Sequence, residues 1–114
     1  MSEEEKGLML TVAWLFAQHG QPRRARTILE CVVEDDATNG IAAAVLAELM
    51  LDDGDAQEAL QTIRAAEFPP RMKRAEAMLE TRALRALGKG DEATARWRRF
   101  LKSSQGDGRE WFSE

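Results

Sequence analysis

Three glycines at a fixed interval constrain this chain more than any other feature of its sequence. Gly20, Gly54 and Gly88 are 34 residues apart each time. Each is followed after five residues by alanine and after nine by an apolar residue, and is preceded by an apolar residue at four. Chance rarely repeats such a set at one interval, so we infer that the chain contains three copies of one structural unit.

A period of 34 residues with this spacing is typical of the tetratricopeptide repeat, a pair of antiparallel helices. The 18 alanines and the scarcity of alternating β-branched residues also favour helix over strand. The sequence therefore predicts an all-α fold, with three tandem repeats that form a short right-handed superhelix. We expect one domain over 1–114, with repeats at 6–39, 40–73 and 74–107 and a short tail at 108–114.

The glycines and prolines predict where the helices begin and end. Each of the three glycines should end the first helix of its repeat by adopting a positive φ angle, and Pro22 suits the start of a second helix. Polar, glycine-containing sequence at 103–108 predicts the end of the last helix. The expected helices are 6–18, 22–35, 40–53, 56–67, 71–87 and 91–103.

The third repeat departs from the other two at the centre of its first helix. Glu80 stands where the first two repeats have Val12 and Leu46, and a threonine follows where they have alanine. We therefore expect this helix to pack less deeply or with a rotated face. The register places Trp97 of the last helix at a core position.

The first helices of stacked repeats line a concave groove, which is where we expect function to lie. In repeats one and two the groove positions are mainly apolar, and in repeat three they carry arginine. Such a groove suits an amphipathic helix. The register gives Leu10 and Trp14 no core role, and the alternative is that Trp14 packs against neighbouring helices. The candidate partner-binding residues are Leu10, Trp14, Ala17, Ile41, Ala44, Glu48, Leu51, Met78, Arg82 and Arg85.

A second interface is predicted at the end of the chain. Stacked repeats usually need a polar capping helix, and the tail is too short to supply one. Either the tail aromatics fold back over the last helix, or another chain covers it. The residues concerned are Phe100, Leu101, Trp111 and Phe112.

The sequence offers little for catalysis, and we predict that the protein is not an enzyme. The only histidine, His19, adjoins a turn, and the single Cys31 allows neither an internal disulfide nor a cysteine metal cluster. We expect no cofactor and no metal. A net charge of −4 argues against nucleic acid as a partner. Two basic clusters on second helices are predicted to face solvent, with i,i+4 partners such as Arg26–Glu30; they are Arg23, Arg24 and Arg26, and Arg96, Arg98, Arg99 and Lys102. The acidic start and the lack of a long apolar run predict a cytoplasmic protein without membrane insertion.

Short stretches at both ends resemble the YscY/SctY family of type III secretion chaperones. The stretches are AWL at 13–15, G-x-P-x-R-A at 20–25, ILE at 28–30, RALRALGKGDEA at 82–93, and RFL at 99–101 after a tryptophan. The length and the three-repeat plan are also similar. The resemblance implies a cytoplasmic bacterial chaperone that pairs with a secreted partner of the SctX type and engages the export gate. The needle co-chaperone family YscG/SctG is a close second resemblance.

The leading functional hypothesis is therefore a chaperone that holds an amphipathic helix of an export substrate in its groove, as a heterodimer. The alternative is a general adaptor that mediates protein assembly or self-association outside secretion. Lys and Asn are missing from the positions that bind acidic C-termini in other tetratricopeptide domains, so such a C-terminus is not expected as the ligand.

Overall fold

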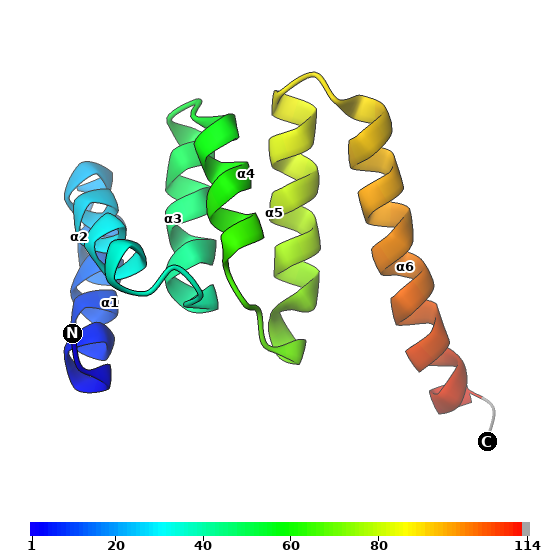
Figure 1. Cartoon of the computed structure of the whole chain (residues 1–114), viewed down its shortest axis with the longest axis horizontal. Coiled ribbons are helices and arrows are strands. Elements are labelled where there is room, and N and C mark those ends of the chain that lie inside the picture. Colours follow the sequence, from blue (N-terminus) through cyan, green and yellow to red (C-terminus); the bar gives the residue numbers. More distant parts are fainter. Residues whose placement is uncertain (113–114) are drawn as a thin grey trace.

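The computed structural model describes the backbone of residues 1–112 and the side chains of residues 1–104. This part of the chain is all-α, which confirms the predicted fold class at that level. Six α-helices and one short 3-10 turn follow one another along the chain (Figure 1). They are α1 (Glu3–Gln18), α2 (Pro22–Asp35), α3 (Gly40–Asp52), α4 (Ala56–Ala65), the 3-10 turn η1 (Pro70–Met72), α5 (Lys73–Ala86) and α6 (Gly90–Phe112).

The three periodic glycines act as the sequence predicts. Gly20, Gly54 and Gly88 have φ angles of 73°, 86° and 77°, the only positive values in the described residues. In each turn a backbone N–H after the first helix returns to a carbonyl near that helix's end, for example from Gln21 to Phe16 at 2.8 Å. Glycine adopts this conformation without the steric cost that a Cβ would impose. The three turns therefore repeat in conformation as well as in sequence.

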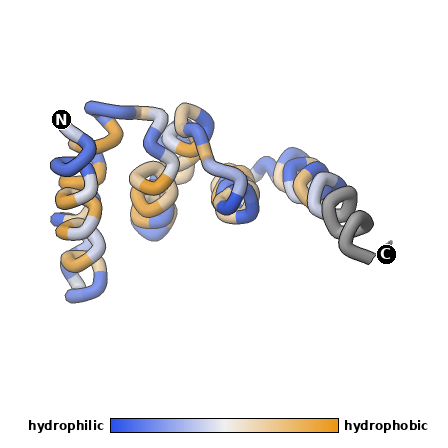
Figure 2. The backbone as a smooth tube through the Cα atoms, turned by 90° about the horizontal axis from the view of Figure 1, so that it is seen from below, coloured by the Kyte–Doolittle hydropathy of each residue, from blue (hydrophilic) through white to orange (hydrophobic). Residues whose placement is uncertain are grey.

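The helices stand side by side in chain order (Figures 1 and 2). Each packs against the next along the chain, and α3 also packs against α5. Short connections join antiparallel neighbours, as in other helical arrays. The molecule is elongated, with extents of 45, 35 and 25 Å. Toward its C-terminal end, α6 diverges from α5 (Figure 1).

Small residues allow the helices to approach closely in the core. Ala13, Ala25, Ala47 and Ala59 are completely buried, and the larger Leu46 fills the space between them at 1% exposure. The main cluster spans α1 to α5, whereas a smaller cluster joins α4, α5 and α6 around Leu60 and Leu84. Alternation of small and large side chains brings such interiors to close packing.

The two longer connections lie against each other: residues 36–39 between α2 and α3, and residues 66–69 between α4 and η1. The backbone N–H of Glu67 donates to the carbonyl of Thr38 at 2.9 Å, and Asn39 and Glu67 form a single parallel β-bridge. Gly40 starts α3 at this contact, where an added Cβ would lie 2.6 Å from the carbonyl oxygen of Glu67. Only glycine fits the space between these two segments of backbone.

The structure corrects four sequence predictions. The last helix does not end at 103–108 but continues to Phe112, and the first helix begins at Glu3 rather than residue 6. Of the two expectations for the first helix of the third repeat, less deep packing is wrong, since Ala77 and Leu84 are 0% and 2% exposed, whereas a rotated face stays a prediction. The burial of this helix is compatible with Glu80 because that carboxylate is ion-paired. Trp97 is only half-buried and not a core residue.

Candidate functional site

One ion pair connects equivalent positions of α3 and α5, the first helices of the second and third helix pairs. Glu48 on α3 and Arg82 on α5 are 34 residues apart, and Nη1 of Arg82 donates to Oε1 of Glu48 at 3.4 Å. Trp14 occupies the same register position on α1, another 34 residues earlier. The pair therefore brings two of the predicted groove positions side by side, on a face that is open to solvent.

The predicted groove residues divide into an exposed set and a half-buried set. Trp14 is 54% exposed, and Ile41 and Met78 are each 45% exposed. Charged Glu48, Arg82 and Arg85 are exposed as well. The half-buried set packs against the core and consists of Leu10, Ala17, Ala44 and Leu51. Leu10 thus has a core role in addition to its place at the surface, contrary to the prediction for it.

A pocket of about 210 Å³ opens between α5 and α6 at the third repeat. It is lined by Met78, Thr81, Arg82, Arg85 and Trp97. Three of these are predicted groove residues, whereas Trp97 comes from the following helix. The half-buried indole and the exposed thioether supply the apolar wall, and two guanidinium groups supply positive charge. We name these five residues the α5–α6 pocket.

The hydroxyl of Thr81 is buried in the α5–α6 pocket lining and finds no hydrogen-bond partner within the described residues. The residue is 6% exposed, whereas the equivalent alanines, Ala13 and Ala47, are fully buried. An unpaired hydroxyl at such a depth costs free energy. On the side of α5 that faces α6, the third repeat therefore has a buried hydroxyl where the other two repeats have alanine.

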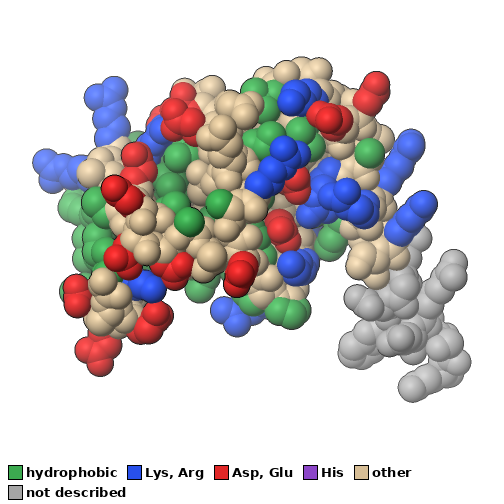
Figure 3. Space-filling view, viewed as in Figure 1, with side chains coloured by type: hydrophobic (Ala, Val, Ile, Leu, Met, Phe, Trp, Pro, Cys, Tyr) green, Lys and Arg blue, Asp and Glu red, His purple; other side chains and the backbone are tan. Residues whose placement is uncertain are grey.

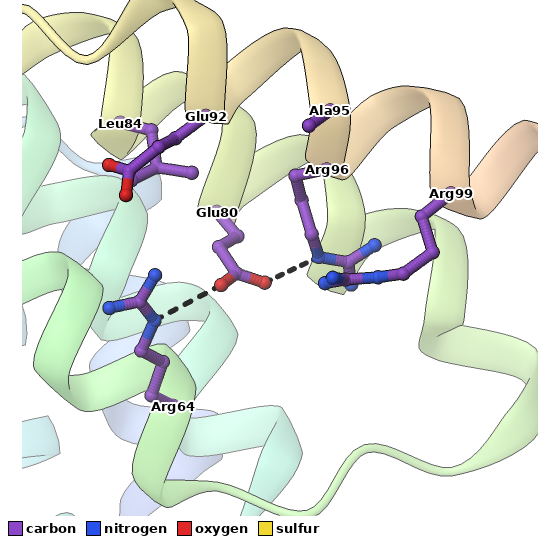
Figure 4. A pocket seen from close by; sticks show the side chains of 7 residues that line it. All are labelled: Arg64, Glu80, Leu84, Glu92, Ala95, Arg96 and Arg99. Atoms are coloured by element: carbon purple, nitrogen blue, oxygen red, sulfur yellow. Dashed lines mark hydrogen bonds and ion pairs between the residues drawn. The ribbon is translucent and has the colours of Figure 1, made fainter.

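An ion-pair cluster lies on the other side of α5 (Figure 4). Glu80 accepts hydrogen bonds from Nε of Arg64 on α4, at 3.1 Å, and from Nε of Arg96 on α6. Burial of Glu80 opposes its ionisation, but the bonds from Arg96 and Arg64 outweigh burial and keep its pKa below the ordinary value. The cluster connects three helices, so Arg96 is not the freely solvated side chain that the sequence predicted.

A comparable cluster surrounds Arg26 on α2. Its guanidinium donates to Asp53 and Asp55 at 2.7 Å, and to Glu30 and Glu58 at 3.1 Å. The predicted pair of Arg26 with Glu30 is therefore confirmed, as one of four contacts. Both ion-pair clusters tie neighbouring helices together, and neither of them includes a predicted groove residue.

The sequence did not single out two further apolar residues on α1. Leu8 and Leu15 are 65% and 44% exposed. Near Leu15, a pocket of about 310 Å³ is lined by Val12, Phe16, His19 and Gln21 as well. The signal was available, because the α1 sequence LMLTVAWLFA is apolar around its whole circumference, which is unusual for a surface helix.

The second predicted interface is only partly within the described side chains. Phe100 is half-buried and packs against Trp97 with the rings tilted at 36° and their centroids 5.3 Å apart, and Leu101 is 40% exposed. The side chains of Trp111 and Phe112 lie outside the described residues, so their part in a second interface stays a prediction. The backbone of α6 continues straight past 103–108 rather than folding back there (Figure 1).

Residues that could bind a metal or react with a substrate do not cluster within the described side chains. Among the described side chains, no cluster of His, Cys, Asp and Glu is suited to hold a metal ion. Cys31 and His19 are both exposed, on different elements. No helix in the described part of the chain combines the length and the apolar character needed to cross a membrane.

Comparison with known protein families, with curated sequences and with solved structures finds no match to this chain.

Proposed function

We propose that this protein is a tetratricopeptide-type binding module whose exposed first-helix face holds an amphipathic helix of a partner protein. In its more specific form, the proposal is a cytoplasmic chaperone of a type III secretion system, with an export substrate as the partner. The observation that carries the proposal is the exposure of Trp14, at 54%, on the face where Glu48 and Arg82 meet.

Exposed apolar side chains on this face support a protein partner. Trp14, Ile41 and Met78 come from α1, α3 and α5, so the apolar surface is spread over three helices. Burial of apolar surface contributes roughly 25 cal/mol per Å², and tryptophan is prominent among residues that dominate binding energies. An amphipathic helix presents side chains at the spacing needed to reach several such positions.

The 34-residue repetition of the glycine turns supports the tetratricopeptide and superhelix parts of the proposal. The secretion role rests on the resemblance of the stretches at 13–30 and 82–101 to the YscY/SctY and YscG/SctG families. The alternative function is an adaptor for protein assembly or self-association outside secretion. The exposed Leu8 and Leu15 on α1 favour this alternative, because they add an apolar surface beside the groove face.

Site-specific photocrosslinking in the native host tests the proposal. A photoreactive amino acid replaces Trp14 in one strain and Arg98, an exposed residue of α6, in a matched control strain. We expect a crosslinked partner from position 14 and little from position 98. An export substrate among the partners would support the chaperone role, whereas partners unrelated to secretion would support the adaptor role. Equal crosslinking from both positions would contradict the proposed binding face.

Replacement of the tryptophan provides an independent measurement. Trp14→Ala should weaken binding of the captured partner by tenfold or more, because truncation of a central tryptophan typically costs at least about 2 kcal/mol. Helicity by circular dichroism should change little, since the side chain is largely outside the core. Unchanged affinity would show that Trp14 does not contact the partner.

A further inference from the structure

We infer that the α5–α6 pocket recognises side-chain carboxylates next to an apolar residue, so that the bound helix is an acidic amphipathic helix. This inference rests on the proposed function and specifies the chemistry of the partner. The apolar residue would fill the pocket against Trp97 and Met78, and a carboxylate one turn away would pair with Arg85.

The lining of the pocket supports both parts of this recognition. Its volume of about 210 Å³ accommodates one large side chain. Trp97 of α6 and Met78 of α5 provide the apolar part of its lining. Arg82 and Arg85 belong to the same face of α5, because they are three residues apart. A side chain that enters the pocket therefore comes close to two guanidinium groups.

The two arginines differ in how far they are already neutralised. Arg82 has a long contact of 3.4 Å to Glu48, in which both side chains are about half exposed. Within residues 1–104 no acidic side chain forms an ion pair with Arg85. Arg85 is therefore the available cation at the pocket, and a guanidinium suits a carboxylate because it offers paired N–H donors.

The distribution of charge along the chain favours an acidic partner at this end. Residues 71–104 contain ten Lys and Arg against four Asp and Glu, a net charge of +6, although the whole chain is at −4. Residues 1–70 contain five basic and thirteen acidic residues, a net charge of −8. In Figure 3, blue side chains gather over α5 and α6, and red ones are more frequent over α1 to α4. Complementary charge at this end would orient a bound helix.

Selection from a peptide library tests the inference and requires no purified partner. The probe is a phage-displayed library of 20-residue peptides, with leucine fixed at helical spacing i, i+3, i+4 and i+7 and all other positions randomised. The full chain and its Arg85→Glu variant are the targets. The matched control is Arg98→Glu, which makes the same charge change at an exposed position of α6 outside the pocket.

We expect the full chain and Arg98→Glu to enrich Asp and Glu beside a fixed leucine, and Arg85→Glu to lose this preference. A selected acidic peptide should bind Arg85→Glu about five- to thirtyfold more weakly, and Arg98→Glu within about twofold of the unaltered chain.

The other outcomes separate this inference from the proposed function. Selected peptides without acidic enrichment, or acidic peptides that bind Arg85→Glu equally well, would overturn the pocket assignment and leave the groove intact. If no peptide is selected and the chain self-associates at the same concentration, both the pocket inference and the proposed function are wrong, and the face binds a second copy of the chain. If no peptide is selected and the chain is monomeric, both are wrong as well.

Discussion

Glu48 and Arg82 lie at the same register position of successive helix pairs and form an ion pair across α3 and α5, at 3.4 Å between Oε1 and Nη1. The pair is exposed, with 61% and 47% of the two side chains accessible. Its position on the candidate binding face suggests a role in setting the charge of that face rather than in holding the helices together.

The first prediction concerns the stability that this ion pair contributes. Because the pair is exposed and long, a double-mutant cycle with Glu48→Ala and Arg82→Ala should give a coupling energy below about 0.5 kcal/mol. Urea denaturation monitored by circular dichroism measures it. A coupling above about 1 kcal/mol would show that the pair is a structural contact and not mainly a feature of the binding face.

The second prediction concerns Glu80, which is largely shielded between Arg64 and Arg96. Glu80→Gln should lower the free energy of unfolding at pH 7 by about 2 kcal/mol, because two arginines lose their charged partner. Since folding lowers the pKa of Glu80, its contribution is complete above the ordinary value of 4.5 and is lost as the pH falls through the lowered value.

Thermal denaturation from pH 7 to pH 2 checks this pH dependence. Below pH 4.5 the unaltered protein should lose more stability than Glu80→Gln does. Glu92→Gln is the matched control, because Glu92 is exposed beside the same cluster. Parallel curves for the unaltered protein and Glu80→Gln would contradict the assignment of this acid sensitivity to Glu80.

The third prediction concerns the contact between the two longer connections. Gly40→Ala should destabilise the protein by about 2–3 kcal/mol, because the new Cβ would meet the backbone carbonyl of Glu67. Gly7→Ala is the control, because Gly7 lies within α1 with open space around it, and should stabilise by up to about 1 kcal/mol. Equal effects in chemical denaturation would show that the connections are not closely packed.

The fourth prediction concerns the unpaired hydroxyl of Thr81. Thr81→Val keeps the volume and removes the hydroxyl, so it should raise the free energy of unfolding by about 1 kcal/mol. Thr62→Val is the comparison, because the Thr62 hydroxyl bonds to the carbonyl of Glu58 at 2.9 Å and should give no such gain. Destabilisation by Thr81→Val would indicate that the hydroxyl has a partner in solution.

Most helix boundaries were predictable because local residues determine them. Gly20, Gly54 and Gly88 end the first helices, and Pro22 begins α2, through backbone preferences that do not depend on distant contacts. The end of α6 was not predicted. Its glycines at 106 and 108 favour a break by intrinsic propensity, yet the helix continues to Phe112.

The candidate site was predictable in its positions but not in its environment. The register placed Trp14 and Met78 at positions that the structure leaves exposed, whereas the half-burial of Leu10 depends on how closely α1 packs against the core. The role of Glu80 was missed because its two partners are each 16 residues away in the chain. The sequence shows that Glu80 stands where the other repeats have an apolar residue, which indicates different packing. It does not show that Arg64 and Arg96 are the partners of Glu80.

The attachment of α6 has a consequence for how ligands would be sensed. This helix packs mainly on α5, whereas α3 is held by α2, α4 and α5. Helices with few neighbours open locally at a lower free energy than the rest of a domain, so amide hydrogens of α6 should exchange before those of α3. A ligand in the α5–α6 pocket would contact Trp97 and should therefore slow amide exchange in α6, so the exchange rate of the last helix would report whether the pocket is occupied.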